Sequence, residues 1–169
     1  MALTELEGAV LTEIAHRGNH TSFKVRRAFQ TSPSSSWSGS AGAVYPAIAR
    51  LERAGLILAE PGTSRRGTRI LSLSTAGAEA LKAWLFDGET ACSIGADPFR
   101  LRSGLWNTLG EEDRRKVVRT MKAAVEAEMA KLVSRTALDP VEDVGNDLAI
   151  RLQQLRLDWL DEFDRALPG

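Results

Sequence analysis

The clearest candidate binding residues in this sequence are two arginines, because of the residues that precede them. Arg50 and Arg53 belong to a stretch, Ser40 to Ile57, that reads as one amphipathic helix followed by its stop signal. Gly42 and Pro46, two poor helix formers, lie in its first two turns. On a helical wheel, these four residues share the face opposite the apolar stripe. This face has little side-chain bulk in the first turns of the helix and two cations in the later turns. Such a surface suits the entry of a helix N-terminus into the major groove of DNA.

The helix that must position these residues is predicted over about residues 40–53. Its buried stripe is formed by Val44, Ile48 and Leu51. Ser40 is predicted to cap its N-terminus. Gly55 lies where a left-handed residue commonly ends a helix, and Leu56 is then placed to close onto Leu51 in a Schellman motif.

The elements around this helix are those of a winged helix-turn-helix. Before it, the patterns predict helices over residues 4–17 and 21–30, then a serine-rich loop, TSPSSSWSG. After it, GLILAE and TRILSLS predict a two-stranded hairpin with Arg65 and Arg66 at its tip, and Ser74 then caps a helix over about 75–86. Arginines at a hairpin tip suit a minor groove or its flanking phosphates. The sequence therefore predicts a mainly α protein with a two-stranded β wing.

The second half is predicted to be a separate helical domain. Residues 87–96 form a linker between a DNA-binding domain over residues 1–86 and a dimerisation domain over residues 97–169. Asp97 and Pro98 begin the first helix of that domain. Two long helices follow, over about residues 111–135 and 141–166.

The last helix is apolar on two sides. One stripe contains Val144, Leu148, Leu152, Leu155, Trp159 and Phe163, and Ile150 and Leu157 lie on nearly the opposite face. A helix with two apolar faces needs two partners, and a second copy is the simplest source of one of them. We therefore predict a homodimer through Ile150, Leu152, Leu155, Leu157 and Trp159. Which stripe forms the interface stays open, and the second stripe could instead pack against the linker or winged domain of its own chain.

Charge is distributed unevenly along the chain. The sequence has 22 Lys and Arg against 22 Asp and Glu, yet residues 1–85 carry a net +4 and residues 86–169 a net −4. This asymmetry indicates that the first half meets a polyanion. The N-terminus lacks the features of a signal peptide, no apolar run is long enough to span a membrane, and the single cysteine is Cys92. We expect a cytoplasmic protein without membrane contact.

Enzymatic chemistry finds little support in the sequence. His16 and His20 are four residues apart, but Gly18 lies between them and they do not share a helical face. No cluster of His, Cys, Asp and Glu has the spacing of a metal site, and there is no Gly-rich phosphate loop or Ser/His/Asp arrangement. We therefore expect neither an enzyme nor a bound cofactor or metal.

The stretch around the third helix resembles a family signature. The pattern W-x-x-S-x-G-S-L-Y-P-x-L-x-x-L-E-x-x-G-L-I of the PadR family of bacterial transcriptional regulators is matched at Trp37, Ser40, Gly42, Val44, Tyr45, Pro46, Ile48, Leu51, Glu52, Gly55, Leu56 and Ile57. SLSTAGAEAL resembles the family's segment after the wing. DPFRLR and LRLDWL are similar to the C-terminal domain of PadR subfamily 1, the virulence activator alpha type.

The resemblance implies a dimeric winged-helix repressor that binds a pseudo-palindromic operator in double-stranded DNA and is released by a small molecule. It assigns DNA contact to Ser40, Gly42, Ala43, Tyr45 and Pro46. Wheel position and wing chemistry, not the signature, add Arg50, Arg53, Arg65 and Arg66. Tyr45 could also be a residue at the edge of the core. The chain departs from the family at Ser22-Phe23, at Ala43 and at Arg69-Ile70-Leu71, which removes polar groups near the DNA and bears on sequence preference.

Two further alternatives stay open. Trp84, Trp106 and Trp159 could line a site for a small aromatic or hydrophobic effector, as PadR relatives have, or serve only as anchors of the core and the interface. The winged helix could also act as a protein–protein interaction module without specific DNA binding.

Overall fold

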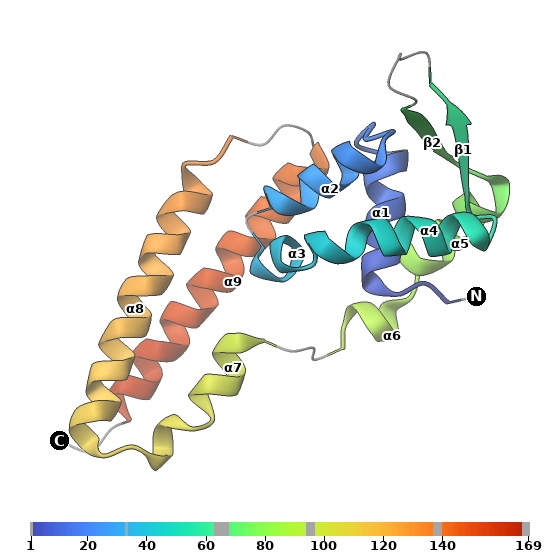
Figure 1. Ribbon diagram of the computed structural model, residues 1–169. Coiled ribbons are helices and arrows are strands. Elements are labelled where there is room, and N and C mark those ends of the chain that lie inside the picture. Colours follow the sequence, from blue (N-terminus) through green and yellow to red (C-terminus); the bar gives the residue numbers. More distant parts are fainter. Residues whose placement is uncertain (1, 33, 63–67, 94–96, 137–139, 167–169) are drawn as a thin grey trace. The chain divides into compact units, whose positions relative to one another are not determined.

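The chain divides into two compact units, residues 1–93 and 94–169, each with an apolar core. The computed structural model describes residues 2–32, 34–62, 68–93, 97–136 and 140–166 (Figure 1). The first unit contains α1 (Glu5–Ala15), α2 (Ser22–Gln30), α3 (Ser35–Gly39), α4 (Val44–Arg53), β1 (Ile57–Pro61), β2 (Arg69–Leu73), α5 (Thr75–Leu85) and α6 (Gly88–Ala91). The second contains α7 (Pro98–Ser103), α8 (Glu111–Val133) and α9 (Pro140–Arg165).

The first unit is a winged helix, as the sequence predicts. Its core is built from the inner faces of α1, α2 and α4, closed by the hairpin and α5. The fully or almost fully buried side chains include Val10, Leu11, Ile14, Val25, Val44, Ile48, Leu51, Ile57, Leu71 and Leu81. The predicted stripe of the third helix is therefore confirmed as its buried face. Burial of this stripe fixes which face of α4 is exposed.

Hydrogen bonds to nearby residues define several helix ends. Thr4 and Glu7 form the capping box of α1, and Ser74 caps α5. Gly55 has φ 71°, in the left-handed region, and ends α4. The N–H of Leu56 donates to the carbonyl of Leu51 over 2.9 Å, which completes the predicted Schellman motif.

The serine-rich segment before α4 is not a loop, contrary to the prediction. It contains the short helix α3, capped by the hydroxyl of Ser34, which accepts from the N–H of Trp37. The indole of Trp37 meets the ring of Phe29 edge-on, with 5.6 Å between the ring centroids. This contact with α2 supplies the apolar anchor that local sequence signals do not reveal.

The third predicted helix begins later than expected, at Val44, after a 3-10 turn over Ala41–Ala43. Ser40 is not its cap, because its hydroxyl donates to the carbonyl of Ser36 over 2.7 Å and so ends α3. Pro46 is consequently the third residue of α4. No N–H at that position has an intrahelical acceptor, so proline costs the helix no hydrogen bond there.

The wing is a two-stranded antiparallel hairpin. Ile57 pairs with Leu73, and the ladder continues to Pro61 and Arg69. The N–H of Leu71 also donates to the carbonyl of His20 over 2.8 Å, which ties β2 to the segment between α1 and α2. The hairpin tip, with the predicted Arg65 and Arg66, lies outside the described residues.

The second unit is built on two long helices that Figure 1 shows side by side and running in opposite directions. The inner side of α8 carries the buried Val118, Val125 and Leu132 and the partly buried Met121 and Met129. The helix predicted from Asp97 is capped as expected but ends at Ser103, and a 3-10 turn over Trp106–Thr108 follows.

The part of the chain that the structure describes contains no helix suited to spanning a membrane. None of the helices in those residues combines the length and the apolar character that a membrane span requires.

Candidate nucleic-acid interface

The N-terminal end of α4 presents a surface with little side-chain bulk, and the packing of the described residues does not require this lack of bulk. Gly42, Ala43 and Pro46 are all exposed. A Cβ built on Gly42 would meet no atom within 4 Å, and its backbone is outside the left-handed region. A Cβ would therefore fit at Gly42. The packing of the described residues does not require glycine at this position.

Tyr45, at the same end of α4, is also exposed. Its side chain is 45% exposed, and the guanidinium of Arg26 on α2 lies 5.7 Å from the centre of its ring. Lys24 and Arg27 on the same helix are exposed as well. Alternation of basic and apolar residues places these cations on the outside of α2, but only the packing of α2 against α4 brings Arg26 to Tyr45.

Arg50 is held by a carboxylate that the sequence does not identify as its partner. Its Nε donates to Oε1 of Glu7 on α1 over 2.9 Å. Glu7 is only 5% exposed, and its other oxygen accepts the N–H of Thr4 over 3.1 Å. Burial alone raises the pKa of Glu7, but the hydrogen bonds from Thr4 and Arg50 outweigh it and leave the pKa below its ordinary value.

Arg53 on α4 and Arg69 in the wing make contacts of other kinds. Arg53 is exposed, and its Nε donates to the carbonyl of Ala49 in its own helix over 3.3 Å. Arg69, the first residue of β2, makes a two-pronged contact with the carboxylate of Glu52 on α4, with Nη1 3.2 Å from Oε2 and Nη2 on Oε1. This ion pair fixes the start of β2 against α4. Seventeen residues separate its partners, so no local pattern indicates it.

The structure thus gathers most of the predicted contact residues at one end of α4. Gly42, Ala43, Tyr45 and Pro46 are exposed there, and Arg50 and Arg53 follow on the same helix. Ser40 is partly buried and is occupied by Ser36. Arg65 and Arg66 fall within residues 63–67, outside the described part of the chain.

Most of one apolar stripe of α9 is left exposed by the described residues of its own unit. Val144, Leu148, Leu152, Leu155 and Trp159 are 71, 58, 50, 63 and 37% exposed. The side that faces α8 includes the fully buried Leu160 and the partly buried Leu157. At the end of the stripe, Trp159 and Phe163 pack together in an aromatic cluster. Ile150 is partly buried. Of the five predicted dimer residues, Leu152, Leu155 and Trp159 are therefore exposed, and Leu157 is used within the protomer.

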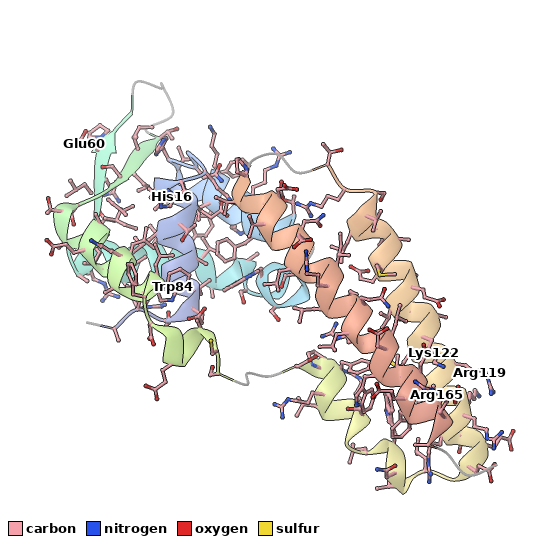
Figure 2. The ribbon with its side chains drawn as sticks, turned by 180° about the vertical axis from the view of Figure 1, so that it is seen from behind. His16, Glu60, Trp84, Arg119, Lys122 and Arg165 are labelled. Carbon is pink, nitrogen blue, oxygen red and sulfur yellow. The ribbon has the colours of Figure 1, made fainter. Side chains whose placement is uncertain are left out.

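The three tryptophans named as candidate effector residues fall into two groups. Trp106 and Trp159 lie in one aromatic cluster of the second unit, 5.8 Å apart, together with Phe99 and Phe163. Trp84 belongs to the first unit, where it projects from α5 to α1 (Figure 2) and donates from its indole nitrogen to Glu5 over 3.1 Å.

An arginine adds to the contacts by which Phe99 joins α7 to this cluster. Arg156 on α9 contacts both oxygens of Asp97, at 3.1 and 3.2 Å, and lies 5.3 Å from the centre of the Phe99 ring. Burial raises the pKa of Asp97, but the N–H of Phe99 and the charge of Arg156 outweigh it, so the pKa is lowered. The N-cap of α7 is therefore also its attachment point.

No group of three or more His, Cys, Asp or Glu residues that could hold a metal ion occurs among the described residues. His16 and His20 are both exposed.

The fold is similar to that of solved PadR-like regulators. Bacillus subtilis PadR in complex with operator DNA has a TM-score of 0.74 and 14% identity, over 98% of this chain and 100% of that one. Its complex with p-coumaric acid gives 0.72 at 14% identity, over 98% of both chains. A PadR-like transcriptional regulator from Bacillus cereus gives 0.69 at 17% over 98% of both, and the virulence activator AphA of Vibrio cholerae gives 0.65 at 16% over 95 and 97%.

No protein-family model matches the sequence, and no curated protein matches it. The structural likenesses confirm the predicted fold: a mainly α chain with an N-terminal winged helix, a two-stranded wing and a C-terminal helical part.

Proposed function

We propose that this chain, which has the fold of PadR-like transcriptional regulators, is a sequence-specific DNA-binding regulator that acts as a homodimer. The observation that carries the proposal is the lack of side-chain bulk at the N-terminal end of α4. Gly42 is exposed, has no packing role, and stands at the start of a helix whose exposed side carries cations. A helix that reads base edges in a major groove needs this combination. The B. subtilis PadR complex with operator DNA supports the same use of the fold.

The residues divide into two tasks on the DNA. Gly42, Ala43, Tyr45 and Pro46 form the surface that enters the groove, with Ser40 at its margin. The cations contact phosphates. These are Arg50 and Arg53 on α4, Arg26 beside Tyr45, and Arg65 and Arg66 in the wing, the last two proposed from the sequence alone.

The exposed stripe of α9 supports the proposal of a homodimer. A second copy related by two-fold symmetry would bring the same stripe against itself and cover Leu148, Leu152 and Leu155. Two copies would then present two α4 helices to a pseudo-palindromic operator. In this arrangement the predicted residues Leu152, Leu155 and Trp159 lie at the interface, and Ile150 and Leu157 support it from the protomer side.

Repression relieved by a small aromatic effector is the finer form of the proposal. The cluster of Trp106 and Trp159 supports it, since Trp159 keeps 37% of its surface exposed beside α7. The complex of B. subtilis PadR with p-coumaric acid shows such a ligand on this fold. Trp84 is kept as a separate candidate in the first unit.

A titration with duplex DNA tests the proposal, and Gly42→Leu provides the decisive variant. The wild-type protein should bind a duplex from upstream of its own gene more tightly than a random duplex, and lose at least about tenfold in affinity between roughly 50 and 200 mM salt. Gly42→Leu should bind at least about tenfold more weakly, because its side chain holds α4 away from the bases. Its thermal midpoint should stay unchanged, because the space around Gly42 is open.

Equal affinity of the wild-type protein for specific and random duplex would favour the alternative of a protein–protein interaction module. Unchanged operator affinity in Gly42→Leu would show that this end of α4 does not enter the groove.

Tryptophan fluorescence tests the effector. p-Coumaric acid and related phenolic or planar cationic compounds should change the emission of the wild-type protein in a saturable way. Trp159→Phe should lose most of the change, whereas Trp84→Phe should keep it. A flat response of the wild-type protein across the panel would contradict an effector site at this cluster.

A further inference from the structure

Glu7 is the one charged or polar residue that is buried among the described residues, and the proposed function so far gives it no role. Its two carboxylate oxygens do different things. Oε2 accepts the N–H of Thr4 and completes the cap of α1, whereas Oε1 accepts the Nε–H of Arg50, 43 residues further along the chain. A cap alone would not require the second contact.

The contact with Glu7 uses only the Nε of the Arg50 guanidinium. Only Nε is engaged, at 2.9 Å, and the two terminal nitrogens Nη1 and Nη2 are not bound by the carboxylate. The Arg50 side chain is 45% exposed while the Glu7 side chain is 6% exposed. The anion is thus enclosed by the protein, and the cation that it holds reaches solvent on the side of α4 that carries Gly42 and Pro46.

We propose that Glu7 is a positioning residue for DNA binding: it fixes the guanidinium of Arg50 through Nε so that Nη1 and Nη2 are presented together to one phosphate. This inference rests on the proposed function. A guanidinium can bind two partners through different edges because its N–H groups form a rigid fork. An arginine that is already ordered loses less side-chain entropy when it binds.

Simple electrostatics predicts the opposite effect, which makes the proposal testable. Removing a negative charge close to the DNA-binding surface should tighten binding to DNA if Glu7 acts only through its charge. Removing it should weaken binding if Glu7 positions Arg50. The sign of the change therefore separates the two roles.

The test compares Glu7→Gln with Glu5→Gln by titration of the upstream duplex across a salt series. Glutamine at position 7 keeps an oxygen that can cap α1, which protects the fold. Glu7→Gln should weaken binding by about three- to tenfold. The slope of log affinity against log salt should become shallower by about one phosphate contact per subunit. Glu5→Gln removes the same charge from the same turn of α1, where Glu5 contacts Trp84 rather than Arg50, and should leave the slope unchanged.

A second pair of variants guards against a purely structural effect. Arg50→Lys should bind as weakly as Arg50→Ala, because an ammonium group has no separate edge for the phosphate. Glu7→Gln should have no further effect in the Arg50→Ala background, since there is no guanidinium left to position. A structural role alone would lower the thermal midpoint and leave the salt slope as it is.

The proposal is overturned if Glu7→Gln binds the duplex as tightly as the wild-type protein or more tightly, or if Arg50→Lys retains wild-type affinity. If the wild-type protein shows no preference for the specific duplex, the proposed function fails first. That outcome is separate, because it appears before any variant of Glu7 is compared.

Discussion

Leu155→Glu is expected to convert the protein from a dimer to a monomer and to abolish tight operator binding. Leu155 is 63% exposed in the middle of the exposed stripe of α9. In a two-fold interface each substitution occurs twice, and each places a carboxylate in an apolar contact without a partner. The dimer dissociation constant should rise by at least about a hundredfold. Sedimentation velocity at micromolar concentration measures this directly.

Loss of the dimer should carry over to the DNA. A monomer reaches only one half of a pseudo-palindromic operator, so affinity for the full site should fall by about 10² to 10⁴. Gln154→Glu is the matched control, because it adds the same charge at the neighbouring exposed position outside the stripe. This variant should remain a dimer. A dimeric Leu155→Glu protein would show that the stripe is not the interface.

Gly77→Ala is expected to destabilise the winged unit severely. A Cβ on Gly77 would lie 2.0 Å from the carbonyl oxygen of Leu56. That oxygen cannot move aside easily, because it accepts the N–H of Ser74 and Leu56 is fixed by the Schellman motif. The free energy of unfolding should fall by about 3 kcal/mol. For a unit of this size the thermal midpoint should drop by about 12–24 °C, as measured by circular dichroism.

A second glycine provides the control for this substitution. Gly145 lies inside α9, and a Cβ there would meet no atom within 4 Å. Gly145→Ala should therefore keep or raise the thermal midpoint, since alanine is the better helix former by about 1 kcal/mol. A wild-type midpoint in Gly77→Ala would mean that α5 does not pack against Leu56 as closely as the structure has it.

Several features of the fold could be predicted from short stretches of sequence because their causes are local. The capping box of Thr4 and Glu7, the cap at Ser74 and the left-handed Gly55 each depend on residues within one helical turn. The winged fold could be predicted from the order of the helices and the hairpin along the chain.

Two predictions about the region before α4 are wrong because the causes of the observed structure are not local. The serine-rich segment contains α3, whose Trp37 packs against Phe29 on α2, and the helix predicted from Ser40 therefore begins only at Val44. The residue chosen as the N-cap ends the preceding helix instead. The apparent cost of Pro46 inside a helix disappears with the corrected boundary, because Pro46 lies in the first turn.

The candidate site shows the same division. The sequence itself determines that Pro46, Arg50 and Arg53 lie on the face of the helix away from its buried stripe, because helical periodicity separates them from Val44, Ile48 and Leu51. Tertiary packing alone decides what the residues of α4 meet. It brings Arg26 to Tyr45 and Arg69 to Glu52.

The same holds for Arg50 and for the last helix. Glu7 is a capping residue by its position in the sequence, and becomes the partner of Arg50 only when α1 and α4 pack together. In α9 the sequence establishes two apolar faces but cannot rank them. The side that packs on α8 includes polar residues such as Asn146 and Gln153, whereas the more apolar stripe is exposed. Periodicity reports which residues share a face, and only long-range contacts decide which face is buried.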